Sequence, residues 1–568
     1  MKRLSALATV LLASTFAGAQ QPAQPAPKPP PAPQQPMAPV SESVTVSVTN
    51  IEVVVTDSKG NRVGGLTRED FEVKQDGVPQ PITNFYAVTG GKVLLEDGTT
   101  VSIEEPTAAK ELPSQLKTRY VFYIDNLNIQ PQNRNRMFKR LKEFVRESVG
   151  PQAEAMVVTY NRSLKVKQRF TSDVDDVLGA IENTELDTGG GTTLWSDRRD
   201  NLRRIDESTS PNEALQIARM HSRSLRNDLE FAVDAIKNSL NGLAGVDGRK
   251  VFVYVSEGLP ATAGAEMFDA VTQKFREGGV STLEQFEFDM NTRYASIVQA
   301  ANANGVTLWP LDATGLAVDD LVSAENRTME ARPNSFMMRQ NSQAPLLMMA
   351  EQTGGIAAVN TNDWKRNLDE LARDFSDFYS IGYRSGRAAV DRPHRVEVNV
   401  KRKGLKVRAR KGYLEKTVET RTAEAVEASL YYPREDNPLG IILTVGDSRP
   451  YDRENYLLPI HVAIPLSKMA LVPSGDVYQG NYFLYLKILD VSGKTSDMQI
   501  QRGTVSVPQK ELDNAQKKNW GHPMQLIVVP GGQKIAVGVR DGVSNQTSYV
   551  QKNVFVSVLP KEAGKGGR

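Results

Sequence analysis

The sequence predicts a multidomain protein with α/β and all-β parts: a central doubly wound, mainly parallel β-sheet flanked by β-sandwich-like modules. Two observations predict this fold class. Between residues 115 and 386, continuous apolar runs alternate with helical patterns, which is typical of parallel strands covered on both faces by crossover helices. On either side of this segment, apolar and polar residues alternate singly, as in half-buried antiparallel strands.

The composition is that of a folded protein, and it excludes several classes. The 568 residues include 69 basic and 67 acidic side chains and no cysteine, and this length corresponds to about three or four domains. The lack of cysteine excludes disulfides, thiol nucleophiles, cysteine-ligated metal sites and a cysteine-linked lipid anchor. Because the charges nearly balance, nothing global attracts the chain to nucleic acid, and we expect no nucleic-acid partner.

The first residues predict export. Lys2 and Arg3 precede an apolar stretch over residues 4–16, and Ala17-Gly18-Ala19 has the small-residue pattern of a cleavage site. We therefore expect a signal peptide at residues 1–19 and a periplasmic or extracellular protein. The alternative, an uncleaved anchor, needs about 18 or more apolar residues, and this run is shorter. No later stretch is suited to span a bilayer, so we expect no transmembrane segment in the mature chain.

Two N-terminal segments precede the central part. Residues 20–42 are almost only Pro, Gln and Ala, which predicts an extended tether; a role as a proline-motif ligand is the alternative. Residues 43–90 alternate like strands and contain turn signals at residues 57–61 and at Asp76-Gly77. They predict a small β module, immunoglobulin-like or related.

The central segment, residues 115–386, changes period. Its apolar runs lie at residues 120–124, 155–160, 251–255 and 306–311, with a shorter candidate at 356–359. Helical patterns lie between them at residues 136–148, 174–183, 210–240, 281–304 and 364–378. Ser210, Pro211 and Glu213 form a helix-start signal for the long central helix. Strands that alternate with helices predict right-handed crossovers and a doubly wound sheet.

Polar residues follow two of the predicted strands. Asp125 and Asn128 follow the first strand, Glu257 follows a later one, and a glycine-rich loop lies between them at residues 188–193. In open α/β sheets, ligands bind at the carboxyl ends of the strands. Carboxylate, hydroxyl and amide oxygens are the ligands that Mg²⁺ and Ca²⁺ prefer.

The same residues resemble a known family. Residues 115–386 resemble a von Willebrand factor A domain, whose metal-ion-dependent adhesion site combines Asp-x-Ser-x-Ser, a Thr in a Gly-Gly-Thr loop and a later acidic residue. The chain more closely resembles the bacterial VWFA-related domain family first described from Acidobacteria, over roughly residues 45–415. The resemblance rests on the residues above and on four further segments, at 53–57, 66–71, 378–384 and 404–413. It implies that Asp125, Thr192 and Glu257 are the metal ligands.

The chain departs from the family pattern at two positions. Leu127 and Ile129 replace the two serines, and Asn128 can substitute for them only if the loop shifts by one residue. The site is therefore degenerate, and two readings stay open. Either Asp125, Thr192 and Glu257 hold a single Mg²⁺, Ca²⁺ or Mn²⁺, or the domain binds no metal.

Residues 387–415 predict a basic β-hairpin packed on the preceding domains. Within its basic run, residues 395–411, cations alternate with apolar residues, which places them on one face of a strand. They either form a solvated face that blocks edge pairing or contact an anionic glycan or membrane surface. Residues 317–345 contain methionines without a clear period and predict a mobile insertion.

The C-terminal part returns to strands. About seven short strand patterns between residues 428 and 560 predict a second β-sandwich. Residues 561–568 lack an apolar anchor and predict a disordered tail.

No pattern of residues indicates catalysis. The four histidines lie in separate segments without metal-ligand spacing, and no nucleophile elbow or Walker A loop is present. We therefore expect a protein that is not an enzyme: an exported protein-binding or adhesion-type protein whose A-like domain engages a protein or peptide. The alternative is a structural or scaffold subunit of a cell-envelope or extracellular assembly with a metal-free A domain.

Overall fold

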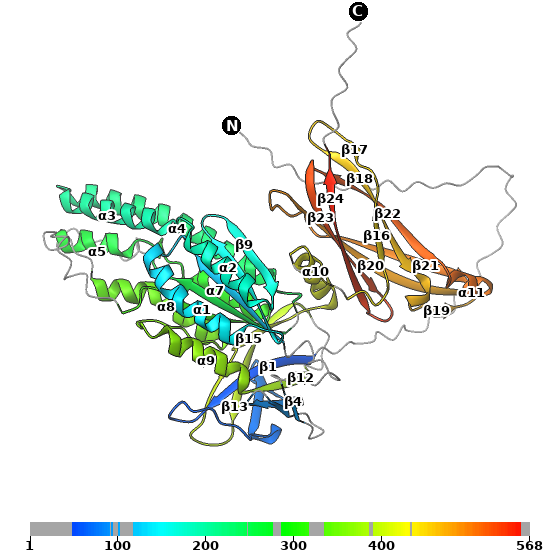
Figure 1. The fold of residues 1–568 in the computed structure, drawn as a ribbon, viewed down its shortest axis with the longest axis horizontal. Coiled ribbons are helices and arrows are strands. Elements are labelled where there is room, and N and C mark those ends of the chain that lie inside the picture. Colours follow the sequence, from blue (N-terminus) through cyan, green and yellow to red (C-terminus); the bar gives the residue numbers. More distant parts are fainter. Residues whose placement is uncertain are drawn as a thin grey trace, which may run out of the picture. The chain divides into compact units, whose positions relative to one another are not determined.

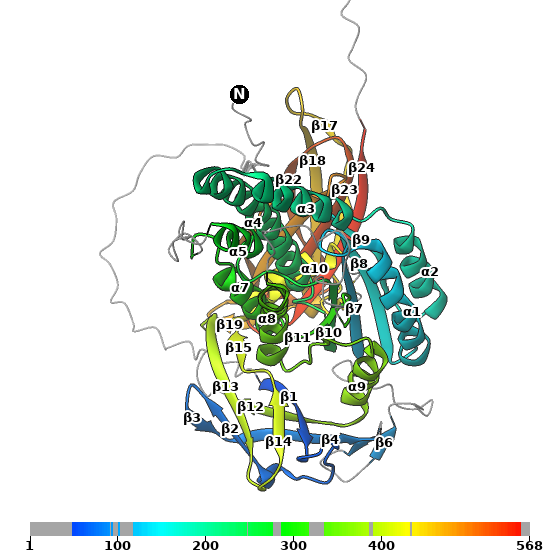
Figure 2. The same ribbon diagram turned by 90° about the vertical axis from the view of Figure 1, so that its left-hand side faces the viewer.

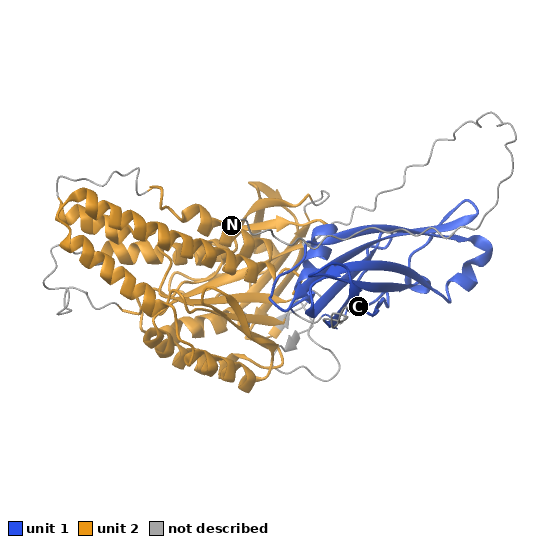
Figure 3. Cartoon of the chain, turned by 90° about the horizontal axis from the view of Figure 1, so that it is seen from above, with its two compact units in different colours: residues 1–46, 418–568 blue, residues 47–417 orange. Residues whose placement is uncertain are grey.

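A computed structural model describes residues 48–90, 92–94, 100–102, 117–246, 248–275, 286–316, 334–384, 390–431, 434 and 436–557. The chain forms two compact units (Figure 3): unit 2 spans Ser47–Thr417, and unit 1 combines Met1–Val46 with Val418–Arg568. The predicted signal peptide (1–19), linker (20–42) and tail (561–568) lie outside the described residues. Among the described helices, none has both the length and the apolar character needed to cross a membrane.

A mainly parallel sheet forms the centre of unit 2, as the sequence predicts (Figure 1). In spatial order its strands are β9 (Leu164–Thr171), β8 (Ala153–Tyr160), β7 (Thr118–Asp125), β10 (Arg249–Ser256) and β11 (Val306–Asp312). Only the edge strand β9 is antiparallel to its neighbour. The short candidate strand at residues 356–359 contributes one parallel bridge, from Ala358 to Leu311.

Helices cover both faces of this sheet. They are α1 (Pro131–Ser148), α2 (Val174–Glu185), α3 (Gly191–Glu207), α4 (Pro211–Asn241), α5 (Ala265–Lys274), α7 (Asn291–Ala303), α8 (Ser335–Thr353) and α9 (Trp364–Ser376). Figure 2 shows α1 and α2 on one side of the sheet and α4 and α7 on the other. The long helix α4 begins as predicted, because the Ser210 side chain accepts a hydrogen bond from the amide of Glu213.

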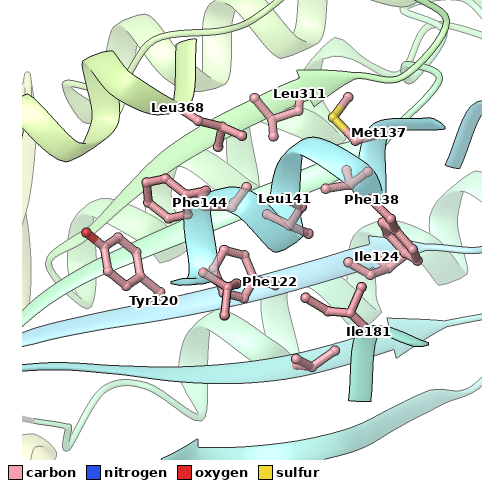
Figure 4. Packing of buried hydrophobic residues seen from close by; sticks show 14 of the residues in the cluster. Tyr120, Phe122, Ile124, Met137, Phe138, Leu141, Phe144, Ile181, Leu311 and Leu368 are labelled. Atoms are coloured by element: carbon pink, nitrogen blue, oxygen red, sulfur yellow. The ribbon is translucent and has the colours of Figure 1, made fainter. Parts of the chain in front are cut away.

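The core between β7 and α1 shows why the apolar run forms a central strand. Phe122 and Ile124 of β7 are buried against α1, whose Phe138, Leu141 and Phe144 face the sheet (Figure 4). Alternate residues of β7 pack on the opposite face, so the strand has no solvated side.

The remainder of unit 2 is antiparallel and combines segments distant in sequence. One sheet has the order β14 (Lys406–Ala409), β1 (Val48–Thr56), β12 (Phe378–Arg384), β4 (Ile82–Thr89), β5 (Lys92–Leu94) and β6 (Thr100–Ser102). Another has the order β15 (Gly412–Glu415), β13 (Arg392–Val400), β2 (Phe71–Gln75) and β3 (Val78–Gln80). One core cluster contains Ile51, Phe71 and Ile381. Residues that precede the α/β segment in sequence therefore share a core with residues at its end.

The basic run at residues 395–411 is solvated in part: Arg395 and Arg402 are exposed, whereas Arg408 and Arg410 are partly covered. Arg408 donates to both carboxylate oxygens of Asp374 on α9, and Arg402 pairs with Asp70. Burial lowers the pKa of Arg410. The expectation of a solvated basic strand is therefore wrong for Arg408 and Arg410, because their face packs on the α/β part of unit 2.

The predicted insertion at residues 317–345 is helical where the structure describes it. Residues 317–333 lie outside the described part, and α8 begins at Ser335 with Asn334 as its cap. The first half of α8 has no apolar period. Polar contacts hold it in place instead. Asn341 donates to the carbonyl of Thr262, and Gln343 donates to Asp312.

Unit 1 contains two antiparallel sheets. One is built from β16 (Ile442–Val445), β17 (Arg449–Pro450), β18 (Tyr456–Pro465) and β22 (Asn519–Val528). The other is built from β19 (Val472–Ser474), β20 (Val477–Asp490), β21 (Gln499–Pro508), β23 (Gly531–Asp541) and β24 (Thr547–Val556). One core cluster includes Leu458 and Ile460 of the first sheet and Leu484 and Val537 of the second. Two helices accompany the sheets, α10 (Val418–Ser429) and the short α11 (Leu512–Ala515).

Candidate binding site at the carboxyl edge of the parallel sheet

The winding of the sheet reverses between β7 and β10. From β7 the chain proceeds to β8 and β9 on one side, and β10 and β11 then add on the other side. Asp125 ends β7, and Glu257 directly follows β10. Both residues therefore lie at the carboxyl edge beside the switch point, where ligands bind in sheets of this kind.

The carboxylate of Asp125 is buried and fully engaged by donors of the protein itself. Its Oδ1 accepts hydrogen bonds from the amides of Leu127 (3.2 Å) and Asn128 (3.1 Å). Its Oδ2 accepts from the Asn128 side-chain amide (2.8 Å) and from the Tyr254 hydroxyl (2.6 Å). Burial raises the pKa of Asp125, and these donors partly oppose that rise.

The two positions that would carry serines are part of the core. Leu127 is 2 % exposed and Ile129 is 1 % exposed, so both anchor the loop that follows β7. Asn128 lies between them and donates its side-chain amide to Asp125. The loop is therefore not shifted in the way that would make Asn128 an oxygen ligand.

Glu257 joins three elements. Its Oε1 accepts from the amide of Gln130 (2.9 Å) and from the side chain of Asn133 on α1 (2.7 Å). Its Oε2 accepts from the indole nitrogen of Trp195 on α3 (3.4 Å). Burial raises the pKa of Glu257, and the negative charge of Asp312 adds to that rise.

The glycine-rich segment at residues 188–193 is a loop in its first half and helical in its second half. Gly191 and Thr192 start α3, and Thr192 is exposed. A Cβ on Gly191 would lie 2.1 Å from the carbonyl oxygen of Ile129, and one on Gly190 would lie 2.8 Å from the Leu127 side chain. The glycines are therefore needed because α3 packs directly on the loop that follows β7.

The oxygens of Asp125, Glu257 and Thr192 do not fit a divalent cation. Mg²⁺ and Ca²⁺ require several free oxygen ligands, whereas the carboxylates of Asp125 and Glu257 already accept hydrogen bonds and Thr192 is exposed. Within the described ranges, no three His, Asp or Glu residues are grouped so that they could hold a metal ion.

A cavity of about 480 Å³ lies over this edge, within the roughly 300–1,000 Å³ typical of ligand pockets. Its lining includes Glu257 and Asn128, but neither Asp125 nor Thr192. Asp312, at the end of β11, also faces it and is 2 % exposed. Asp312 was not predicted from the sequence, although it follows the apolar run at residues 306–311 just as Asp125 follows its own run.

Arg198 of α3 connects the helices around the cavity. Its guanidinium lies 4.9 Å from the centre of the Trp195 ring and 3.3 Å from Glu266 of α5, and it also contacts the sulfur of Met338 on α8. The sequence of α3 resembles an exposed helix with many ion pairs, so it gave no sign of this inward contact. Burial lowers the pKa of His221, which lines the same cavity from α4.

Comparisons with known proteins name no family. No protein-family model matches the chain, and no curated protein matches it. Similar solved structures include a von Willebrand factor type A protein from Catenulispora acidiphila, with 10 % identity over 86 % of this chain and 72 % of that chain and a TM-score of 0.19. BatB from Bacteroides thetaiotaomicron has 11 % identity over 46 % of this chain and 97 % of that chain, with a TM-score of 0.21.

An aerotolerance-related membrane protein from Bacteroides fragilis has 9 % identity over 45 % of this chain and 98 % of that chain, with a TM-score of 0.23. TM-scores this low add nothing to the fold, which rests on the strand order and register of the parallel sheet.

Proposed function

We propose that this chain is an exported, non-enzymatic binding protein whose mainly parallel sheet forms a von Willebrand A-like domain with a degenerate adhesion site. This domain engages a protein or peptide at the carboxyl edge of the sheet, without a divalent cation. The cavity at the switch point carries the proposal, because it adjoins the segments that the family resemblance marks as the binding edge. The signal-peptide pattern at residues 1–19 supports export.

The chemistry of the cavity supports binding rather than catalysis. An activated serine needs a base within hydrogen-bond reach. His221 contacts the side chain of Asn201 at 3.4 Å, and within the described structure no hydrogen bond joins it to the lining hydroxyls of Ser224 or Ser342. The carboxyls of Glu257 and Asp312 accept hydrogen bonds from neighbouring elements, which fixes their positions in the lining.

A substitution that fills the cavity tests this function. Ser224 is exposed on α4 and lines the cavity, whereas Asn227 is exposed on the same helix outside the lining. Peptides selected from a random library on the mature chain are expected to bind Ser224→Trp at least about tenfold more weakly, a change of about 1.4 kcal/mol. Their affinity for Asn227→Trp is expected to match the wild type, with or without EDTA. Isothermal calorimetry measures all of these affinities.

Peptides that bind both variants equally well would contradict recognition through the cavity. They would favour the scaffold alternative, in which the A-like domain is a metal-free packing platform for an envelope or extracellular assembly.

A further inference from the structure

We propose that the group of the partner that enters this cavity is a basic side chain, the ammonium of a lysine or the guanidinium of an arginine. This inference rests on the proposed function and specifies its ligand. Two carboxyl groups that line the cavity, those of Glu257 and Asp312, have no positive partner among the described residues.

Among the described residues, only neutral groups donate to Asp312. Its Oδ1 accepts from the amide of Thr314 (2.9 Å), and its Oδ2 accepts from the side-chain amide of Gln343 (2.8 Å). Burial raises the pKa of Asp312. No ion pair involves Asp312 among the residues that the structure describes. A buried carboxylate without a cation is costly, and a positive group placed beside it relieves that cost.

Glu257 also receives only neutral donors, from Gln130, Asn133 and Trp195. Its Oε1 accepts two short hydrogen bonds, whereas its Oε2 accepts only the long contact of 3.4 Å from Trp195. A carboxylate has about four acceptor positions. Oε2 therefore retains capacity for a hydrogen bond from a ligand.

The remaining charges of the lining largely cancel. In the described structure, the lining contains five carboxylates and four guanidinium groups. Arg162 pairs with Asp228 and Arg198 pairs with Glu266. Arg136 lies over the ring of Trp364 and donates to backbone carbonyls of the loop after β11. The Arg136 side chain is exposed to solvent. Asp197 on α3 and Arg339 on α8 also line the cavity, and neither forms an ion pair among the described residues. Of the three described lining carboxylates without a cationic partner, Asp197 is exposed, whereas Glu257 and Asp312 are largely covered.

The walls suit the aliphatic part of a basic side chain. Leu194 and the exposed ring of Trp195 contribute apolar surface to the lining beside Glu257. Lysine and arginine bury their methylene stems on apolar surface while the charged end reaches a polar site. One ammonium or guanidinium needs few acceptors, whereas a divalent metal requires about six oxygen ligands. The cavity therefore favours an organic cation over a metal ion.

The indole signal of Trp195 provides a direct test. The chain has four tryptophans, so a sample with ¹⁵N-labelled tryptophan gives few indole resonances, and Trp195→Phe identifies the one that contacts Glu257. Titration of the mature chain with Nα-acetyl-lysine methylamide is expected to move this resonance saturably. The neutral norleucine analogue, Nα-acetyl-glutamate methylamide and MgCl₂ are expected to leave it in place.

Two variants complete the test. Asp312→Asn preserves the contact between Trp195 and Glu257 and is expected to weaken lysine-analogue binding by about tenfold, because a charge-assisted interaction is lost. Glu257→Gln is expected to weaken binding similarly in calorimetry. Glu207→Gln, at the exposed end of α3, is the matched control and is expected to bind like the wild type.

An unmoved resonance, or an equal response to lysine and norleucine analogues, would overturn the inference. Selected peptides that lack basic residues but still lose affinity for Ser224→Trp would overturn it while leaving the proposed function intact.

Discussion

Replacement of Asp125 with alanine is expected to lower the free energy of unfolding of unit 2 by about 2–4 kcal/mol. The substitution removes the acceptor for the amides of Leu127 and Asn128, the Asn128 side chain and the Tyr254 hydroxyl. Buried donors without a partner each cost about 1–3 kcal/mol, although loss of a desolvated carboxylate offsets part of that cost. Urea unfolding of the mature chain, followed by tryptophan fluorescence, measures the change.

Asp125→Asn is the matched comparison. It preserves one acceptor oxygen for the two backbone amides and is expected to lose only about 1–2 kcal/mol. Because burial raises the pKa of Asp125 above its ordinary value of 3.8, the folded protein binds this proton more tightly than the unfolded chain does. The stability that Asp125 contributes therefore falls as the pH rises above that value. The loss in Asp125→Asn is expected to be larger at pH 4 than at pH 7. An unchanged unfolding midpoint for Asp125→Ala would contradict the hydrogen-bonded role of this carboxylate.

Replacement of Asp374 with alanine is expected to cost about 3–5 kcal/mol, the range found when one partner of a buried ion pair is removed. Asp374 on α9 is 4 % exposed and accepts from Arg62 and Arg408. Arg62 and Arg408 belong to the antiparallel part of unit 2. Among the described residues, the variant leaves Arg408 without a carboxylate partner and leaves Arg62 with Glu370 alone. Urea unfolding is expected to show a lower midpoint for unit 2.

Asp369→Ala provides the control on the same helix. Asp369 forms an exposed pair with Lys365, and exposed pairs contribute little to stability because solvent screens them. Equal losses in Asp374→Ala and Asp369→Ala would contradict the structural importance of the buried cluster.

The parallel sheet was predictable from sequence because its signals are local. The run at residues 120–124 is apolar on both faces since β7 lies in the middle of the sheet. The start of α4 was predictable from Ser210, Pro211 and Glu213, which satisfy the first amides of the helix.

Long-range pairing was not predictable in the same way. Residues 378–384 read as the end of the central segment, yet β12 lies between β1 and β4. Nothing in an isolated strand identifies its neighbours. The basic residues Arg408 and Arg410 likewise gave no sign that their face would be covered, because burial of an arginine depends on distant carboxylates such as Asp374.

The candidate site was predicted in its position but not in its chemistry. Asp125 and Glu257 were predicted because ligands bind at the carboxyl ends of parallel strands. The groups that donate hydrogen bonds to them, from Tyr254, Asn133 and Trp195, lie on other elements and were not predictable. Leu127 and Ile129 were the one sequence signal that the edge differs from a metal site, and their burial explains the difference.

Calorimetric titration of the mature chain with Mg²⁺, Ca²⁺ and Mn²⁺ tests most directly whether the carboxyl edge of the parallel sheet binds a metal ion. The alternative is that its carboxylates are held by hydrogen bonds alone. No saturable binding is expected, because the oxygens of Asp125 and Glu257 already accept hydrogen bonds. Saturable binding that disappears in folded Asp125→Ala and Glu257→Ala variants would contradict a metal-free edge and establish a working adhesion site.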